Sequence, residues 1–223
     1  MSELRIFVGF DSREAVAFHV CVNSLIRHAS RPLSITPLAL NTLPYWESHK
    51  DGSNAFIYSR FLVPYLCGWT GWALYLDGDM VVKDDVVKLF ERTDPYCDVM
   101  VAKHDYKTKH PVKYMGAKND DYPRKNWSSV ILWNCGNYPN RVLTPEYIQA
   151  QTGDTLHRFK WLDDKRIGSL PLEWNWLVGE YEHNEQAKLL HYTVGIPAFR
   201  EYHDCDHAKD WHSEFRRSIT PCE

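Results

Sequence analysis

The sequence lacks a long apolar run, a signal-peptide pattern and a strong net charge. Its 223 residues contain no run of 18 apolar side chains, and the first ten residues have neither the basic nor the apolar region of a signal peptide. The formal net charge is −3, which gives no general attraction to nucleic acid or to anionic membranes. We therefore expect a cytoplasmic protein without a membrane span.

Paired cysteines are missing as well. The six cysteines are scattered singly, with no Cys-x-x-Cys spacing, so we expect reduced thiols. Hydrophobic residues make up 44% and charged residues 25%, values that exclude wholesale disorder, collagen and coiled coil. No linker or internal repeat divides the chain, and its length is sufficient for a domain to bury its own core.

Apolar runs and helical patterns alternate along the chain, which indicates an α/β fold. The apolar runs predict strands at residues 4–10, 34–40, 72–76, 98–103 and 128–133. Helices are predicted from the Asp-x-x-Glu signature at Asp11, over 55–66, and from Thr144, where a proline follows at the first helical position. This order predicts a mostly parallel sheet with helices on both faces. Ligands bind such sheets at the carboxyl ends of the strands.

One predicted strand ends in Asp77-Gly78-Asp79, the segment with the clearest chemistry. Carboxylates at alternate positions of an extended chain would point to opposite faces, but the glycine between them lets the backbone turn so that both face one point. Oxygen-rich sites of this kind suit Mg²⁺ or Mn²⁺, which bind phosphate oxygens. The alternative is a plain turn. Chance alone gives about one Asp-x-Asp in such a composition, and a second one, Asp204-Cys205-Asp206, follows no apolar strand.

Residues 72–82, WALYLDGDMVV, resemble the metal-binding segment of nucleotide-sugar glycosyltransferases with the GT-A fold. The similarity is to the retaining enzymes of the glycogenin and lipopolysaccharide galactosyltransferase type. Four other segments match that family in the expected order: 8–11, 58–61, 128–134 and 191–197. The likeness implies one Rossmann-like GT-A domain over 1–223, with a mixed, mostly parallel sheet flanked by helices. Residues from about 200 to 223 would be a C-terminal extension.

The resemblance also implies a set of site residues. Asp77, Asp79 and His191 would hold a divalent ion, usually Mn²⁺, against the diphosphate of a UDP-sugar, and a structural role is the alternative for His191. A Lewis-acid ion suits this chemistry because a nucleoside diphosphate leaves readily only when its developing charge is neutralised. The donor-binding positions would be Val8, Gly9, Phe10, Asp11, Tyr58, Arg60, Gly78, Asn134 and Gly195. For Arg60, the alternative is an ion pair on a helix surface.

The chain departs from the family pattern in two places. The family has a lysine beside its final Pro-Trp, in contact with the diphosphate, whereas residues 195–199 read GIPAF. Arg200, or the backbone N–H of the first of these residues, would have to take its place. Residues 161–171 resemble the family's catalytic stretch, with Asp164 where glutamine is common. A carboxylate of Asp164 or Asp163 would stabilise an oxocarbenium-like transition state or act as nucleophile; the alternative is that both begin a helix.

Two other clusters have simpler interpretations. Residues 203–207, HDCDH, with His212 and Cys222 nearby, are reminiscent of zinc sites, but their spacing fits no standard pair of zinc ligands. We interpret them as a polar C-terminal turn and helix. Residues 103–125 carry seven Lys or Arg against three Asp, and we interpret them as a solvated loop. The alternative is an acceptor region that faces a polyanion, such as an anionic glycan or DNA.

These patterns predict a metal-dependent glycosyltransferase, more narrowly a hexosyltransferase. It would move a sugar from a nucleotide sugar, with UDP as the nucleotide, to an unknown acceptor with retention of configuration. Two other classes stay open. One is a non-catalytic nucleotide-sugar binding module, which the missing lysine favours. The other is a metal-dependent phosphoryl-transfer enzyme or nuclease, because paired carboxylates serve two-metal chemistry equally well.

Overall fold

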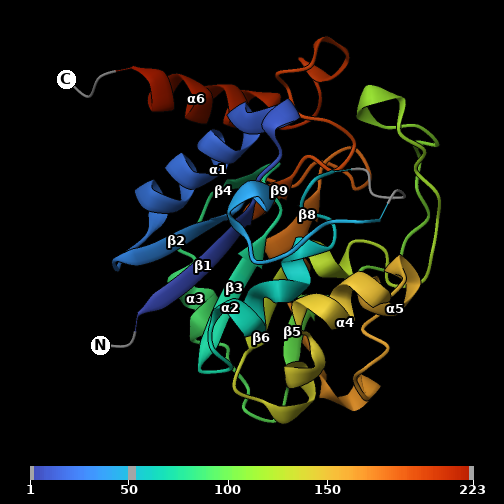
Figure 1. The fold of residues 1–223 in the computed structure, drawn as a ribbon. Coiled ribbons are helices and arrows are strands. Elements are labelled where there is room, and N and C mark those ends of the chain that lie inside the picture. The colour runs from blue at the N-terminus through green and yellow to red at the C-terminus, as the bar shows by residue number, and fades with distance from the viewer. Residues whose placement is uncertain (1–2, 50–53, 221–223) are drawn as a thin grey trace.

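A six-stranded sheet in the order β2-β1-β3-β6-β5-β7 forms the centre of the fold (Figure 1). The computed structural model describes residues 3–49 and 54–220, so that Cys222 of the zinc interpretation lies outside the described residues. The strands of this sheet are β1 (Leu4–Gly9), β2 (Leu33–Leu38), β3 (Trp72–Leu76), β5 (Val99–Ala102), β6 (Val130–Asn134) and β7 (Ile167–Leu170). All run in one direction except β6, which is antiparallel to β3 and β5. The predicted mixed, mostly parallel sheet is confirmed.

Helices cover both faces of this sheet, because successive side chains of each strand point to opposite sides. In β3, Ala73 and Tyr75 belong to one hydrophobic cluster and Leu74 and Leu76 to another. The second cluster packs under α1 (Ala15–His28) and α3 (Val87–Phe90). The helices on the other side are η3 (Ser59–Leu62), α2 (Val63–Leu66), α4 (Pro145–Ala150) and α5 (Gly153–His157). Thr144 caps α4 as predicted, whereas the helix predicted over 55–66 is confined to η3 and α2.

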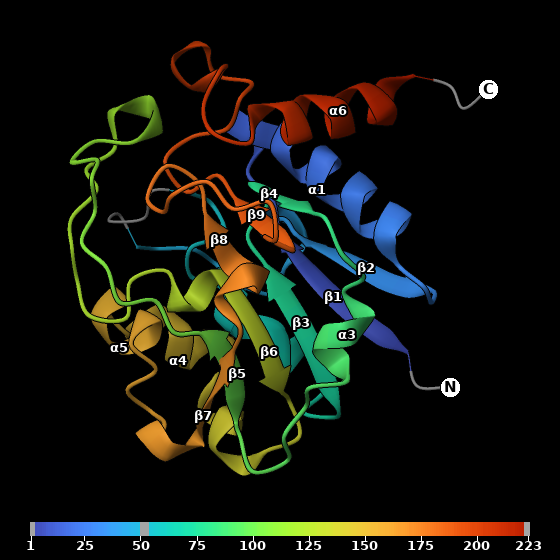
Figure 2. The ribbon, with the colours of Figure 1, turned by 180° about the vertical axis from the view of Figure 1, so that it is seen from behind.

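A second sheet of three strands, which the sequence did not predict, lies beyond the carboxyl end of β3 (Figure 2). Its strands are β4 (Met80–Val82), β8 (Trp176–Leu177) and β9 (Leu189–His191). β4 pairs antiparallel with β9, and Met80 lies opposite His191. This pairing joins the segment after β3 to the last part of the chain.

The C-terminal segment is packed into the domain as far as the structure describes it. The helix α6 (Ala208–Ile219) lies along α1, and its Trp211 is buried (Figures 1 and 2). Asn23 of α1 donates a hydrogen bond to Glu214 of α6, and Arg27 forms an ion pair with the same carboxylate. No helix among the described residues is long and apolar enough to cross a membrane.

Short 3-10 helices complete the connections between these elements. They are η1 (Ser12–Glu14), η2 (Leu40–Thr42), η4 (Tyr114–Gly116), η5 (Trp127–Ser129), η6 (Tyr138–Val142), η7 (Asp164–Arg166), η8 (Leu172–Asn175) and η9 (Arg200–Tyr202). Two of them matter for the site. η1 follows β1 at the carboxyl edge of the main sheet, and η8 precedes β8 in the second sheet.

Candidate metal centre

Three buried side chains converge at the carboxyl edge of the main sheet. Asp77 directly follows β3, and Asp79 directly precedes β4. The β4–β9 pairing brings His191 beside them, and the backbone N–H of Tyr192 donates to the carbonyl of Asp79 at 3.0 Å. One ligand atom from each of Asp77, Asp79 and His191 lies within 4.8 Å of the others. The structure thus brings together the three residues expected to hold a metal.

The glycine between the aspartates is required by close packing. A Cβ atom at Gly78 would lie 2.4 Å from the carbonyl oxygen of Gly9, and a Cβ at Gly9 would lie 2.5 Å from the ring of Phe56. The backbone of Gly78 is not in the left-handed region. The role of this glycine is therefore to let the Asp77–Asp79 segment approach the end of β1, not to supply the free turn predicted from the sequence.

Hydrogen bonds fix the orientation of His191. The amide nitrogen of Asn175 donates to the carbonyl of Asn126 at 3.1 Å, so its oxygen, Oδ1, faces Nδ1 of His191 at 3.0 Å. Because that oxygen only accepts, Nδ1 of His191 carries the hydrogen. In the neutral ring, the lone pair is then on Nε2, which faces the aspartates. A partner on the second nitrogen is the usual arrangement of a metal-binding histidine.

The donor set fits a divalent cation. Nε2 of His191 lies 3.4 Å from Oδ1 of Asp79 and 3.9 Å from Oδ2 of Asp77. Oδ1 of Asp79 is buried and has no hydrogen-bond partner among the described residues. A buried carboxylate oxygen without a partner is costly, and a cation between these acceptor atoms would remove that cost. Two carboxylates and one imidazole suit Mn²⁺ or Mg²⁺.

Arg60 and Tyr75 hold the other oxygen of Asp77. Nη1 of Arg60 lies 2.9 Å from Oδ1 of Asp77, and the Tyr75 hydroxyl donates to the same oxygen at 2.5 Å. Arg60 is buried and also donates to the carbonyl of Ser128 at 2.8 Å, so it is not the helix-surface ion pair considered above. Burial, together with the charge of Asp79, raises the pKa of Asp77 above its ordinary value despite the opposing guanidinium of Arg60.

Glu14 is a buried acid beside this cluster that the sequence did not reveal. Its signature predicted a capping box with Asp11, but Oε1 of Glu14 accepts from the hydroxyl of Tyr114 at 3.0 Å, and Oε2 has no partner among the described residues. Burial and the negative charge of Asp79 raise the pKa of Glu14 to about 8. The sequence gives only a weak signal for a buried Glu14, because a capping glutamate and a buried glutamate can stand at the same distance from Asp11.

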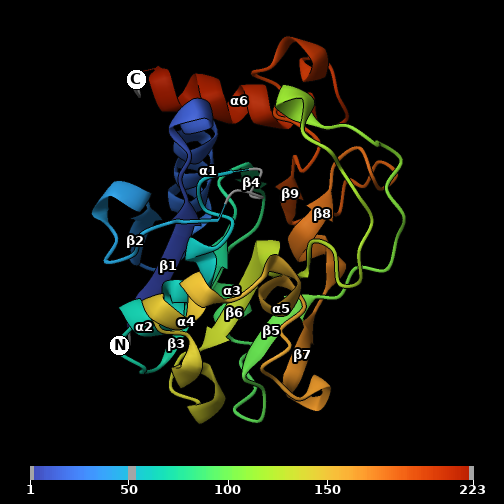
Figure 3. The same ribbon diagram turned by 45° about the vertical axis from the view of Figure 1, so that its right-hand side comes forward.

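Lys113 brings a positive charge to the cluster from the basic segment 103–125. Tyr114, next in the chain, binds the C-terminal part of the fold: its N–H donates to the carbonyl of Val194 at 2.9 Å, and its ring stacks on Phe199. This segment rises beside the C-terminal loops in Figure 3. Burial lowers the pKa of Lys113, against the attraction of Asp79 and Asp77. The segment is therefore ordered around the cluster, not a solvated loop throughout.

A cavity of about 240 Å³ opens between the segment that precedes η3 and the helix α5. It is lined by Ile57, Tyr58, Tyr122, Gly153, Asp154, His157 and Arg158. His157 is buried; its Nδ1 lies 2.7 Å from the Ser128 hydroxyl, and its Nε2 has no partner among the described residues. Burial and the positive charges of Arg60 and Lys113 lower the pKa of His157 well below its ordinary value. The sequence pointed to Tyr58 here but not to His157.

The predicted residues at the end of β1 lie at the same edge. Val8 and Gly9 are buried in the last part of the strand, and the ring of Phe10 packs edge-on against Phe18. Asp11 accepts from the backbone N–H groups of Arg13 and Ala55, each at 2.9 Å. Burial acts against ionisation of Asp11, but these hydrogen bonds and the Arg13 guanidinium keep its pKa below its ordinary value.

The structure does not bring Asn134, Asp163 or Asp164 to this edge. Because β6 is antiparallel, Asn134 at its end pairs with Trp72 at the start of β3, and its amide donates to the carbonyl of Cys97. Asp163 and Asp164 precede β7, which is parallel to the neighbouring β5, so they also lie at the amino edge. The Asp164 side chain is 76% exposed and forms an ion pair with Arg124 at 2.6 Å. These placements correct the donor-binding and catalytic roles expected of the three residues.

The two candidates for the missing lysine differ in burial. Gly195 is buried, and a Cβ atom there would lie 2.3 Å from the ring of Tyr202. Arg200 lies in η9 and is exposed. Lys113, which the sequence placed only within the basic segment 103–125, acts electrostatically on both aspartates, as Arg60 also does.

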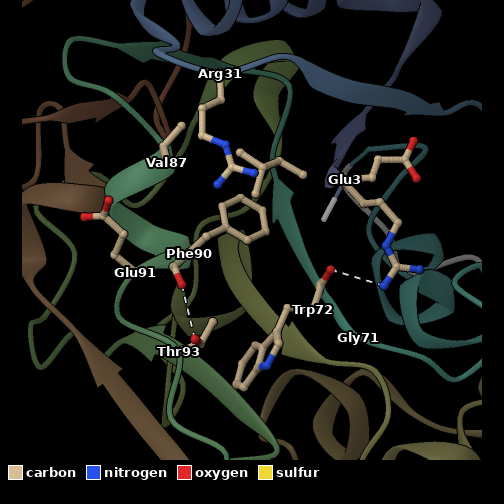
Figure 4. A pocket seen from close by; sticks show the side chains of 10 residues that line it. Glu3, Arg31, Gly71, Trp72, Val87, Phe90, Glu91 and Thr93 are labelled. Carbon is tan, nitrogen blue, oxygen red and sulfur yellow. Dashed lines mark hydrogen bonds between the residues drawn. The ribbon is translucent and has the colours of Figure 1, made fainter. Parts of the chain in front are cut away.

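A larger cavity, about 480 Å³, lies at the amino edge of the sheet (Figure 4). Trp72, Phe90 and Glu91 line it together with Arg5. The Arg5 guanidinium is engaged by the carbonyl oxygens of Thr70 and Trp72. The edge that carries this cavity is opposite to the one that carries Asp77, so the cavity is not part of the candidate metal centre.

Comparisons with solved structures define the fold class. The chain aligns with the apo structure of the bifunctional glycosyltransferase WbbM at a TM-score of 0.68 and 18% identity, over 99% of this chain and 50% of that one. It aligns with galactosyltransferase LgtC, solved in complex with donor and acceptor sugar analogues, at 0.65 and 14%, over 99% and 98% of the two chains. The glycosyltransferase GlyE of Streptococcus pneumoniae gives 0.62 and 16%, over 98% and 62%. The chain thus spans half of WbbM and under two thirds of GlyE. Its fold is the GT-A fold of nucleotide-sugar glycosyltransferases.

One sequence relative narrows the classification. Protein CDI of Arabidopsis thaliana is 42% identical over 220 residues, which cover 94% of this chain and 85% of that protein. No protein-family model matches the chain. The chain belongs to the family of protein CDI.

Proposed function

We propose that this chain is a glycosyltransferase that binds a nucleotide sugar through a divalent cation, Mn²⁺ or Mg²⁺, held by Asp77, Asp79 and His191. The observation that carries the proposal is the pair of facing acceptor atoms, Oδ1 of Asp79 and Nε2 of His191, at the carboxyl edge of a GT-A sheet. The similarity in fold to LgtC, whose structure holds donor and acceptor sugar analogues, supports a sugar nucleotide as the ligand.

The protein side of the site is preorganised. A bound divalent cation would neutralise the negative charge that develops on the departing diphosphate. Asn175 keeps the lone pair of His191 directed at the site, and Arg60 with Tyr75 keeps Asp77 in place. Groups that are fixed before the reaction lose little energy in reorganisation, which is why such sites stabilise a transition state.

Lys113 is our candidate for the positive charge that residues 195–199 lack. Its ammonium is in electrostatic range of Asp77 and Asp79, and Tyr114 anchors it to Val194 and Phe199. A diphosphate bound to a cation at the aspartates would also lie near this ammonium. A charge-assisted hydrogen bond from lysine to phosphate is worth about 1.5–3 kcal/mol.

We assign the nucleoside and the sugar of the donor to two groups of residues near the metal centre. We place the nucleoside at Val8 and Gly9, which end β1 beside Gly78, and at Phe10 and Asp11, which directly follow the strand. The cavity of about 240 Å³ beside Arg60, with Tyr58 and the neutral His157, would receive the sugar. UDP as the nucleotide, a hexose as the sugar and retention of configuration remain the proposal for the reaction.

A thermal-shift panel tests the donor. The chain is heated with UDP- and GDP-sugars, each with Mn²⁺ and with a chelator, since a ligand that binds only the folded state raises the melting temperature. We expect one UDP-sugar to raise the melting temperature, and to do so only when Mn²⁺ is present. The same mixture should release UDP slowly. Cleavage of a phosphoester or of nucleic acid, without stabilisation by any sugar nucleotide, would contradict the proposal.

A non-catalytic sugar-nucleotide binding module is the second candidate. One observation favours it: the two carboxylates expected to act at the sugar, Asp163 and Asp164, lie at the opposite edge of the sheet. Metal-dependent stabilisation by a UDP-sugar without UDP release, in the presence of varied acceptors, would identify such a module.

A further inference from the structure

A second group of metal-binding side chains lies away from the Asp77 centre. A cavity of about 620 Å³ is lined by residues 203–210, His212, His183 and Glu185. His183 belongs to the loop between β8 and β9, whereas Asp206 and His207 directly precede α6. One ligand atom from each of His183, Asp206 and His207 lies within 4.8 Å of the others. The sequence spacing of 203–207 gave no zinc pattern because His183 comes from another loop.

The ring of His207 is buried and oriented by a carboxylate. Its side chain is 1% exposed, and its Nδ1 lies 2.9 Å from Oδ2 of Asp210. A carboxylate only accepts, so Nδ1 of His207 carries the hydrogen of this bond. The other nitrogen, Nε2, has no hydrogen-bond partner among the described residues. A carboxylate behind the imidazole is the arrangement that holds and strengthens a histidine as a zinc ligand.

A second unpartnered atom faces this nitrogen. Oδ2 of Asp206 lies 3.7 Å from Nε2 of His207, is buried, and likewise has no partner in the described part of the chain. The distance is too long for a hydrogen bond. Two ligand atoms bound to the same tetrahedral Zn²⁺ lie about 3.4 Å apart, given metal–ligand lengths near 2.1 Å. The two atoms are therefore already spaced for a shared cation.

His183 completes the group. Its ring stacks on that of His207 with 4.3 Å between centroids, and its Nδ1 lies 2.6 Å from Oδ1 of Asp206. The other ring nitrogen of His183, Nε2, lies 3.0 Å from Oε1 of Glu185. The His183 side chain is 51% exposed, so its ring can give up this surface contact and turn toward the cation without disturbing the core. Two imidazoles and one carboxylate form a donor set for zinc, whereas the two carboxylates and one imidazole at Asp77 favour Mn²⁺ or Mg²⁺.

We propose that His183, Asp206 and His207 form a zinc-binding site that is independent of the Asp77 centre, with solvent as the remaining ligand. A cation there would tie the β8–β9 loop to the start of α6. Because α6 packs along α1, the zinc would clamp the C-terminal helix onto the domain. Zinc binding there would add to the free energy of unfolding.

The test measures Zn²⁺ binding to the full chain in an Asp79→Asn background, which removes the first site. We expect one Zn²⁺ to bind with a dissociation constant of 10 µM or tighter, in competition with a chromogenic chelator, and the ion to raise the melting temperature. Both effects should weaken at least tenfold, or vanish, in His183→Ala and in Asp206→Asn. His183 is half exposed, so its replacement tests zinc binding without removing a buried side chain. His207→Ala, in contrast, would remove a buried ring.

His203→Ala is the matched control. His203 lines the same cavity but lies outside the group of three, so zinc affinity should stay within about threefold of the parent. Co²⁺ in place of Zn²⁺ should give the visible absorption of a tetrahedral site in the parent and not in His183→Ala. Binding weaker than 100 µM in the Asp79→Asn background, or an equal loss in His203→Ala, would overturn the proposal. Neither result would affect the Mn²⁺ site, which is measured in the chain that retains Asp79.

Discussion

The hydroxyl of Tyr114 donates a hydrogen bond to Oε1 of Glu14 over 3.0 Å, between two positions 100 residues apart in the chain. Through this contact, the basic segment is held against the first turn after β1, where Glu14 faces the metal centre. The same tyrosine binds Val194 and Phe199. Three segments that are far apart in the sequence therefore meet at Tyr114.

Glu14 predicts a pH dependence of stability in metal-free buffer. Its pKa is about 8 in the folded chain against an ordinary 4.5, so between these values the folded state keeps a proton that the unfolded state has lost. Stability should then fall as pH rises, by about 1.4 kcal/mol per pH unit at most. Glu14→Gln should remove this slope and be more stable than the parent at pH 8. Urea unfolding at pH 5.5, 7 and 8.5 gives the free energy of unfolding of the parent and of Glu14→Gln. The same change of this free energy with pH in both proteins would contradict the prediction.

Asp79→Asn should abolish metal-dependent donor binding. The amide keeps the size of the side chain but removes the charge and one ligand oxygen, so the stabilisation by Mn²⁺ with UDP should disappear. UDP release should fall at least 100-fold, about 2.7 kcal/mol, as expected when a Lewis acid is lost from a phosphate site. Asp204→Asn, in the other Asp-x-Asp, is the control and should behave as the parent. Full turnover in Asp79→Asn would exclude the metal centre.

Asn175 should act as a positioning residue for His191. Asn175→Ala removes the acceptor at Nδ1, and loss of such a partner lowers metal affinity about 10–100-fold. Asn175→Asp restores an acceptor and should recover part of that affinity. Mn²⁺ binding followed by electron paramagnetic resonance, without nucleotide, gives the readout. Equal affinities in the two variants would show that Asn175 does not act through His191.

Lys113→Met should weaken nucleotide binding and leave metal binding intact. Loss of a charge-assisted contact to phosphate, about 1.5–3 kcal/mol, predicts a rise of about 10–100-fold in the dissociation constant of UDP with saturating Mn²⁺. Lys118→Met is the control, because Lys118 is 78% exposed and pairs with Asp120. Calorimetry with UDP measures both variants. The same UDP affinity in both would remove Lys113 from the diphosphate site.

The strands and the carboxyl edge of the sheet follow from local sequence patterns. Short apolar runs ending in polar residues predicted β1 and β3, and Asp77 and Asp79 lie at the edge where such sheets bind ligands. His191 was expected only through the resemblance. Its place depends on the β4–β9 ladder, and the pairing of short strands so far apart in the chain has no local signal.

Two errors arose because a local pattern lacks direction. An apolar run reads the same whether the strand is parallel or antiparallel, so the sequence could not show that Asn134 lies at the far end of a reversed strand. Spacing also does not show where a side chain turns. Asp11 does cap the turn after β1, but Glu14 faces Tyr114 instead of the backbone.

The β4–β9 ladder has a consequence for biosynthesis. β9 ends at His191, about 20 residues after the last strand of the six-stranded sheet. When only that sheet has been synthesised, the chain therefore contains both aspartates but not His191. Binding of manganese at the Asp77 centre would thus require that β9 has been synthesised and has paired with β4. Fragments ending before Leu189 should retain the acidic pair without this capacity.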